Sequence, residues 1–258
     1  DTGSYTPVVQ FGGQQIRVYT NAPDNLNDAS TGGDLWLHVG SWAGLGGATK
    51  VLHIIEPRDT WIRTSGVAQG ASGAYYAVLY TGDGYPTQGG YSPSWATSDD
   101  GYAWMWHGPI SPFGRNQSSA MNLIVDEARD DAYRFMFWMD IPSGLVLVHS
   151  GDGATWESDG LNVWPIAGEV PQFVSAARDQ YGYHLTGSDR YDGTTGQSIR
   201  YVFSCDGLTG WRVLETNSAV GSGTAKGVNL VADNANGLIH ALSWLGEHWQ
   251  IPIREWGC

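Results

Sequence analysis

A short motif that recurs at a nearly fixed interval is the feature that most constrains how this chain can fold. Ser-x-Asp-Gly occurs at residues 98–101, 150–153 and 204–207, so successive copies are 52 and 54 residues apart. A tryptophan follows each copy, at Trp104, Trp156 and Trp211. Asp-Gly is a tight-turn dipeptide between antiparallel strands, and the tryptophan after it can pack between neighbouring sheets. A repeat of this length predicts an array of equivalent β-units.

Strand-like segments fill the intervals between these turns. Each motif ends an alternating segment, YSPSWATS, GLVLVHS or IRYVFS. A second similarity lies upstream, where VNLVADNANG (228–237) matches MNLIVDEARD (121–130), and another strand-like segment follows each of them. The unit is therefore four antiparallel strands with the first strand innermost, which is typical of a propeller blade.

The length of 258 residues divides into five such units. We predict a single all-β domain, 1–258, that forms a five-bladed β-propeller with four-stranded antiparallel blades. The expected blades cover 22–63, 64–112, 118–166, 168–215 and 224–256. Within the first, DLWLHVGSWAG (34–44) is expected to be the second strand. The fifth lacks an obvious fourth strand, and QIRVYT (15–20) is expected to supply it and close the ring.

A double-sheet sandwich is the alternative fold. It explains the number of strands but not the repeat near 52 residues. Helical periodicity is nearly absent.

Charge, hydropathy and cysteine content narrow the class of protein. The net charge of −13 disfavours nucleic acid as a partner, because binding it needs a lysine- and arginine-rich surface. No apolar run approaches the roughly 20 residues that span a bilayer, so we expect no membrane insertion. Cys205 and Cys258 form an even pair, which indicates one disulfide; two buried thiols are the alternative. Because the chain starts at Asp1, we expect a secreted, mature protein, and we expect a monomer.

Two carboxylates are candidates for acid–base chemistry at the mouth of the propeller axis. Glu169 directly precedes the first strand of the fourth unit, and an apolar funnel wall would raise its pKa and suit it to act as a general acid. Asp24 lies in NAPDNLND and is the candidate general base. The alternatives are a solvated loop carboxylate for Glu169 and a turn aspartate for Asp24.

Amides and tryptophans form the candidate substrate-binding set. Asn122 and Asn229 share one repeat position on innermost strands, where each contacts an axial ligand or ion, or bonds the adjacent blade. A calcium ion on the axis is one such ion; no spacing typical of zinc ligands occurs, so no metal ligand is assigned. Trp42, Trp138 and Trp244 end second strands and form stacking platforms for sugars, or pack between blades.

Histidine and tyrosine offer a different chemistry. His38 and His184 are expected on second strands, in the similar segments WLHVGS and YHLTGS. Either could remove a proton from a sugar, with Tyr183 as the acid. The alternative is that they are half-buried strand histidines.

The segment GEVPQFVSAARDQYGYHLTGS (168–188) resembles the fourth-blade signature of the arabinanase and β-xylosidase group of five-bladed glycoside hydrolases. This resemblance implies that Glu169 is the general acid and that Asp24 is the nearest match to the base. The chain departs from the group where a third aspartate belongs, because Ala120 or Met121 stands there with Asn122 nearby. The Ser-x-Asp-Gly turns are also similar to sialidase Asp boxes. Sialidase activity is disfavoured, because its arginine cluster needs several arginines on inner strands and the sequence offers little beyond Arg129, Arg178 and Arg134.

Three functions follow from these observations, all with a polysaccharide or oligosaccharide as partner. The first is a secreted glycoside hydrolase that uses the carboxylate pair. The second is a polysaccharide lyase that uses histidine and tyrosine on a uronate-containing glycan. The third is a sugar-binding propeller without catalysis.

Overall fold

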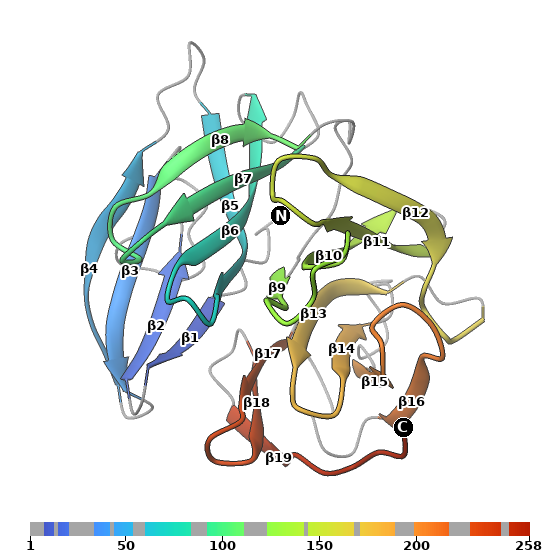
Figure 1. Cartoon of the computed structure of the whole chain (residues 1–258). Helices are drawn as coiled ribbons and strands as arrows, with labels where there is room; N and C mark the ends of the chain where they lie inside the picture. Colours follow the sequence, from blue (N-terminus) through green and yellow to red (C-terminus); the bar gives the residue numbers. More distant parts are fainter. Residues whose placement is uncertain are drawn as a thin grey trace, which may run out of the picture.

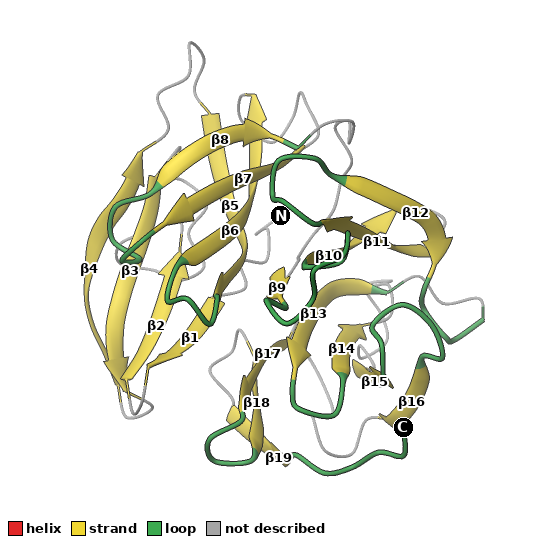
Figure 2. Ribbon diagram, viewed as in Figure 1, coloured by secondary structure: helices red, strands yellow, loops and turns green. Residues whose placement is uncertain are grey.

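The fold is described from a computed structural model of the chain. It covers residues 8–12, 15–20, 34–41, 44–53, 60–83, 92–110, 123–141, 144–167, 171–188, 199–216, 228–243 and 248–258. Every regular element within these ranges is a β-strand (Figure 2). No helix long and apolar enough to cross a bilayer occurs in them.

Five antiparallel sheets follow one another around a common centre (Figure 1). Blade one holds β1 (Val8–Gly12), β2 (Gln15–Thr20), β3 (Asp34–Ser41) and β4 (Gly44–His53). Blade two holds β5 (Thr60–Gln69), β6 (Tyr75–Asp83), β7 (Ser92–Ser98) and β8 (Met105–Pro109). Blade three holds β9 (Leu123–Val125), β10 (Phe135–Ile141), β11 (Gly144–Ser150) and β12 (Glu157–Asn162).

The last two blades complete the circle. Blade four holds β13 (Gln172–Arg178), β14 (Tyr183–Ser188), β15 (Ile199–Ser204) and β16 (Arg212–Thr216). Blade five holds β17 (Val228–Asp233), β18 (Leu238–Ser243) and β19 (His248–Pro252). The strands of each sheet are hydrogen-bonded in sequence order.

The first strands of the blades form the inner ring. Strand β5 contacts β1 and β9, β13 contacts β9 and β17, and β17 contacts β1. Each first strand thus lies between the first strands of two other blades, which closes the ring. The predicted five-bladed β-propeller is confirmed, and the sandwich alternative is excluded.

Two details of the predicted blades are wrong. QIRVYT is β2, which pairs with β1 and β3 inside blade one and adds no strand to blade five. The segment at 34–41 is consequently the third strand of its blade, not the second, and blade five has three described strands. The inner strand of blade one, VVQFG, lacks the polar turn that follows β9, β13 and β17, so the repeat gave no sign of it.

Burial along the strands depends on their distance from the axis. Every residue of β11 is buried, because this strand lies between β10 and β12 and neighbouring blades cover both faces of its sheet. The outermost strands β8 and β19 alternate exposed and partly buried residues, since one of their faces meets solvent.

The hydrophobic core is divided among the interfaces between blades. One cluster joins blades one and two, with Tyr19 and Leu37 packed against Ile62 and Leu79. Corresponding clusters join blades two and three, three and four, and four and five. Stability therefore comes from burying apolar faces between sheets, as a propeller requires.

The repeated turns are built in the same way in blades two, three and four. One carboxylate oxygen of Asp152 accepts hydrogen bonds from the backbone N–H groups of Ala154 and Thr155, at 2.8 and 2.7 Å. The Ser150 hydroxyl accepts from the N–H of Gly153 at 2.8 Å. Asp100 and Asp206 accept equivalent bonds. Backbone donors that favour the charged carboxylate lower the pKa of Asp152 and of Asp100.

The tryptophan after each turn packs towards the preceding blade, as the repeat predicted. The Trp104 ring meets Tyr19 edge-on, Trp156 meets Trp95, and Trp211 meets Trp138. The Trp156 indole N–H also donates to the Gly153 carbonyl at 3.0 Å.

Polar contacts between blades identify one end of the propeller, which we call the turn end. Ser72, after β5, donates from its backbone N–H to Glu127, after β9, at 2.8 Å. Arg129, after β9, donates to the carbonyl of Asp206, after β15, at 3.2 Å. The turns after first and third strands therefore share this end. Because neighbouring strands are antiparallel, the connections after second and fourth strands lie at the opposite end, the loop end.

A disulfide fastens the chain after β19 to blade four. Cys205 and Cys258 are bonded across 53 residues, as predicted. Arg212 of β16 donates to the carbonyl oxygens of Trp256 and Gly257. Residues 253–258 are thus tied to blade four by one covalent link and by hydrogen bonds.

Removing the disulfide should destabilise the ring. For Cys258→Ser with Cys205→Ser, we expect a loss of about 2–4 kcal/mol in the free energy of unfolding, because the unfolded chain gains conformational freedom. Urea unfolding followed by tryptophan fluorescence measures this. Unchanged stability in the double variant would show that the link is dispensable for ring closure.

The turn glycines test the packing between blades. Gly153 has φ +74°, and a Cβ there would meet the Trp95 ring at 3.1 Å, whereas a Cβ at Gly210 (φ +61°) would meet nothing within 4 Å. Both Gly→Ala variants strain the backbone, but only Gly153→Ala also presses on another blade. We expect Gly153→Ala to cost at least about 1 kcal/mol more than Gly210→Ala in urea unfolding; equal losses would contradict this packing.

Candidate functional site

The two predicted catalytic carboxylates belong to chain segments at the loop end. Glu169 and Asp24 themselves lie outside the described residues. Glu169 falls in the sequence between the fourth strand β12 and the first strand β13, and Asp24 falls between β2 and β3. Both connections follow a second or fourth strand. Asp24 therefore does not precede the inner strand of blade one, as its assignment assumed; β1 is that strand.

The described residues on either side of Glu169 are tightly held. A Cβ at Gly187 of β14 would come within 2.7 Å of Pro171 and 3.0 Å of Trp164. Trp164 and Pro171 are both buried. These close contacts position both ends of the short segment that carries Glu169 against the second strand of blade four.

Three predicted substrate-binding residues also lie outside the described residues, namely Trp42, Trp244 and Asn122. The strands that precede Trp42 and Trp244 in the sequence nevertheless show that the two Ser-Trp repeats follow strands of different rank in their blades. Trp244 follows the second strand β18, but Trp42 follows the third strand β3. The two segments therefore connect strands at opposite ends of the propeller, and the similarity of SWAG to SWLG does not mark equivalent positions.

Trp138 and Asn229 are described and are buried. Trp138 lies within β10, with 1% of its surface exposed, and its ring meets Trp211 edge-on at a centroid distance of 5.8 Å. Trp138 thus packs between blades three and four, which was the alternative to a stacking platform for sugars. Asn229 lies on the inner strand β17, next to Leu230, whose N–H donates to the Ser175 hydroxyl of β13 at 2.7 Å.

His184 is at the centre of a buried polar group in blade four. One ring nitrogen lies 3.0 Å from an Asp179 carboxylate oxygen and the other lies 2.7 Å from the Tyr201 hydroxyl. Burial opposes ionisation of Asp179, but the His184 bond and the N–H groups of Tyr181 and Gly182 outweigh it and lower the pKa of Asp179. This arrangement fixes the turn after β13 and leaves no ring nitrogen of His184 free.

Tyr183 and His38 are engaged in a similar way. The Tyr183 hydroxyl donates to Asp126 at 2.8 Å, and Arg178 pairs with the same carboxylate at 3.0 Å, which links blades three and four. Burial raises the pKa of Tyr183. His38 is buried on the third strand β3, not on a second strand, with one ring nitrogen 3.3 Å from the Thr20 hydroxyl.

Sequence reasoning did not single out Asp126, Asp179 and Asp233. Asp126 and Asp179 directly follow inner strands and Asp233 ends one, in the repeated segments LIVDEARD, SAARDQYG and LVADNANG. Their recurrence was visible in the sequence, and it marks the turn end.

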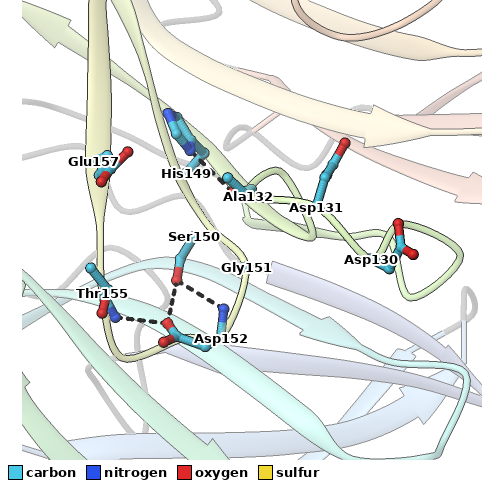
Figure 3. A pocket seen from close by; sticks show the side chains of 9 residues that line it. All are labelled: Asp130, Asp131, Ala132, His149, Ser150, Gly151, Asp152, Thr155 and Glu157. Atoms are coloured by element: carbon cyan, nitrogen blue, oxygen red, sulfur yellow. Dashed lines mark hydrogen bonds between the residues drawn. The ribbon is translucent and has the colours of Figure 1, made fainter.

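An acidic pocket opens at the turn end of blade three (Figure 3). Asp130, Asp131, Asp152 and Glu157 line it, around a cavity of about 360 Å³. His149 lies beside them, with one ring nitrogen 3.1 Å from the Ala132 carbonyl and the other 3.3 Å from Asp159. Within the described ranges, no group of three or more histidine, cysteine or carboxylate side chains could hold a metal ion.

Comparisons with known proteins address the fold. No protein-family model matches the chain, and no curated protein matches it. Among solved structures, it is similar to an exo-1,5-α-L-arabinanase from a bovine ruminal metagenomic library, with TM-score 0.61, 13% identity and 97% of each chain covered.

Two further solved structures are also similar to this chain over most of its length. The GH43 endo-arabinanase from Bacillus licheniformis gives TM-score 0.64 and 12% identity, covering 97% of this chain and 93% of that one. An exo-β-1,3-galactanase from Clostridium thermocellum gives 0.65 and 15%, covering 92% and 53%. The chain therefore has the five-bladed propeller fold of these glycoside hydrolases, which agrees with the group that its fourth-blade segment resembles.

A histidine pair in blade five predicts a pH dependence. His240 and His248 stack, with a 2.8 Å contact between ring nitrogens, and Asp233 lies 3.6 Å from His240. Burial lowers the pKa of both, and the neighbouring His248 lowers that of His240 further. The unfolded chain, with histidine pKa about 6.5, then binds more protons than the folded one as the pH falls.

We therefore expect the free energy of unfolding to fall between about pH 7 and pH 5, and His248→Asn to reduce this slope. Urea unfolding at a series of pH values measures it. The exposed His107→Asn serves as the control. A slope that His248→Asn leaves unchanged would contradict the assignment.

Proposed function

We propose that this protein is a secreted glycoside hydrolase that cleaves a polysaccharide or oligosaccharide at the loop end of the propeller axis. The observation that carries the proposal is the position of the Glu169 segment, which leads from β12 into the inner-ring strand β13. The fold shared with arabinanases and galactanases supports a carbohydrate substrate. The disulfide supports an extracellular location.

In the proposed mechanism, Glu169 protonates the glycosidic oxygen as the bond to the anomeric carbon breaks. Asp24 takes a proton from the water that attacks the opposite face of the sugar. Such an inverting reaction needs the two carboxyl groups about 6.5–9.5 Å apart, to leave room for the water. The connections of Glu169 and Asp24 both belong to the loop end, which is compatible with a pair across the axis.

The lyase alternative draws less support. It needs an accessible histidine and tyrosine, but His184 and Tyr183 are buried and hydrogen-bonded to Asp179 and Asp126. His38 is buried as well.

A product screen tests the proposal. The protein is incubated with plant, algal and microbial polysaccharides, and reducing ends and absorbance near 235 nm are measured. We expect new reducing ends without that absorbance. Glu169→Gln and Asp24→Asn should each lower the rate by about 100-fold or more, whereas Glu157→Gln, at the turn end, should not.

Absorbance near 235 nm would reveal unsaturated uronates and replace the hydrolase with a lyase. Hydrolysis that survives Glu169→Gln would remove Glu169 from the mechanism.

A further inference from the structure

A second cavity lies away from the axis, between the outer parts of blades two and three. It measures about 470 Å³ and is lined by Trp95, Thr97 and His107 of blade two and by Asp152, Gly153 and Trp156 of blade three. We call it the interblade groove. A volume of this size suits a small ligand of one or two rings.

A hydrogen-bond donor without a described protein acceptor, the indole N–H of Trp95, lies in the wall of this groove. Trp95 is 94% buried, since only 6% of its surface is exposed. Its indole nitrogen edge lies against Gly153, where a Cβ would be 3.3 Å from Nε1. Among the described residues, no acceptor bonds this N–H, and Nε1 is not one of the fully buried polar atoms that lack a partner, so the donor is accessible. A ligand in the groove can therefore accept a hydrogen bond from this N–H in place of water.

The rim of the groove adds two further polar groups, the carboxylate of Asp152 and the imidazole ring of His107. The turn uses one carboxylate oxygen of Asp152, and no described protein group donates to the other. His107 contacts the Thr97 hydroxyl through Nε2 at 2.8 Å, which leaves Nδ1 without a described protein partner.

A backbone irregularity presents His107 at this rim. The pairing of β7 with β8 shifts between Trp95 and Ala96, so His107 is an extra residue opposite them, followed by Gly108 at φ +96°. Bulges of this kind redirect a side chain from its regular place in the strand.

We propose that the interblade groove is a second carbohydrate-binding site, separate from the proposed catalytic site, that takes one or two neutral sugar residues. Sugar hydroxyls both donate and accept, so one ring can accept from the Trp95 indole and donate to the free oxygen of Asp152. The edges of Trp95 and Trp156 supply apolar contact for sugar C–H groups. The Asp152 carboxylate and the net charge of −13 disfavour uronates.

The test measures binding directly. Neutral trisaccharides of arabinose, galactose, xylose, mannose and glucose, and digalacturonate as the acidic comparison, are titrated to millimolar concentration into ¹⁵N-labelled Glu169→Gln protein. The indole N–H signals are followed by NMR. Loss of one signal in Trp95→Phe assigns that residue. We expect at least one neutral trisaccharide to shift the Trp95 signal saturably.

Two variants and one control complete the experiment. Trp95→Phe keeps an aromatic side chain but removes the indole N–H donor, and His107→Ala removes an exposed side chain. Each should weaken the Kd for the trisaccharide about fivefold to tenfold. Trp106→Phe is the matched control, because its indole nitrogen is also without a partner but packs in the blade one and two cluster. It should keep the original Kd.

The proposal is overturned if no neutral trisaccharide moves the Trp95 signal, if Trp106→Phe weakens binding as much as Trp95→Phe, or if only digalacturonate binds. Because the readout is binding and not cleavage, a protein without hydrolase activity could still pass this test, and an active one could fail it.

Discussion

Closure of the inner ring is the constraint on which the rest of the structure depends. A propeller is stable only when its last blade meets its first, and here the contact between β1 and β17 makes that closure. Blade five has three described strands, so it offers less sheet to hold the ring than the other blades. The Cys205–Cys258 disulfide and the bonds from Arg212 attach residues after β19 to blade four.

The contacts that join the blades and the proposed catalytic residues belong to opposite ends of the propeller. At the turn end, charged and polar pairs cross between blades, as with Glu127 and Ser72 or Asp126 and Arg178. The loop end carries the connections that contain Glu169 and Asp24. Substitutions there can change chemistry without loosening the contacts that orient the blades.

The sequence predicted the architecture well because the turn chemistry repeats. Ser, Asp and Gly occupy positions that the turn requires, and Trp fills the space beside the preceding blade, so the blades could be recognised from residue types. Blade one was misjudged because VVQFG carries none of these residues, and its third strand was taken for a second. The roles of Trp138, His38 and His184 were less predictable, because a strand residue's burial depends on the neighbouring blade, which periodicity within one strand does not reveal.

The central claim is that substrate binds at the loop end. Hydrogen–deuterium exchange of Glu169→Gln, with and without the polysaccharide that the wild-type protein cleaves, tests it most directly. The account predicts that substrate slows exchange in peptides that contain residues 21–33 and 168–170, at the connections after β2 and β12, and leaves the turns after β5, β9 and β13 unchanged. Protection confined to those turns, with none in the two loop-end connections, would contradict it.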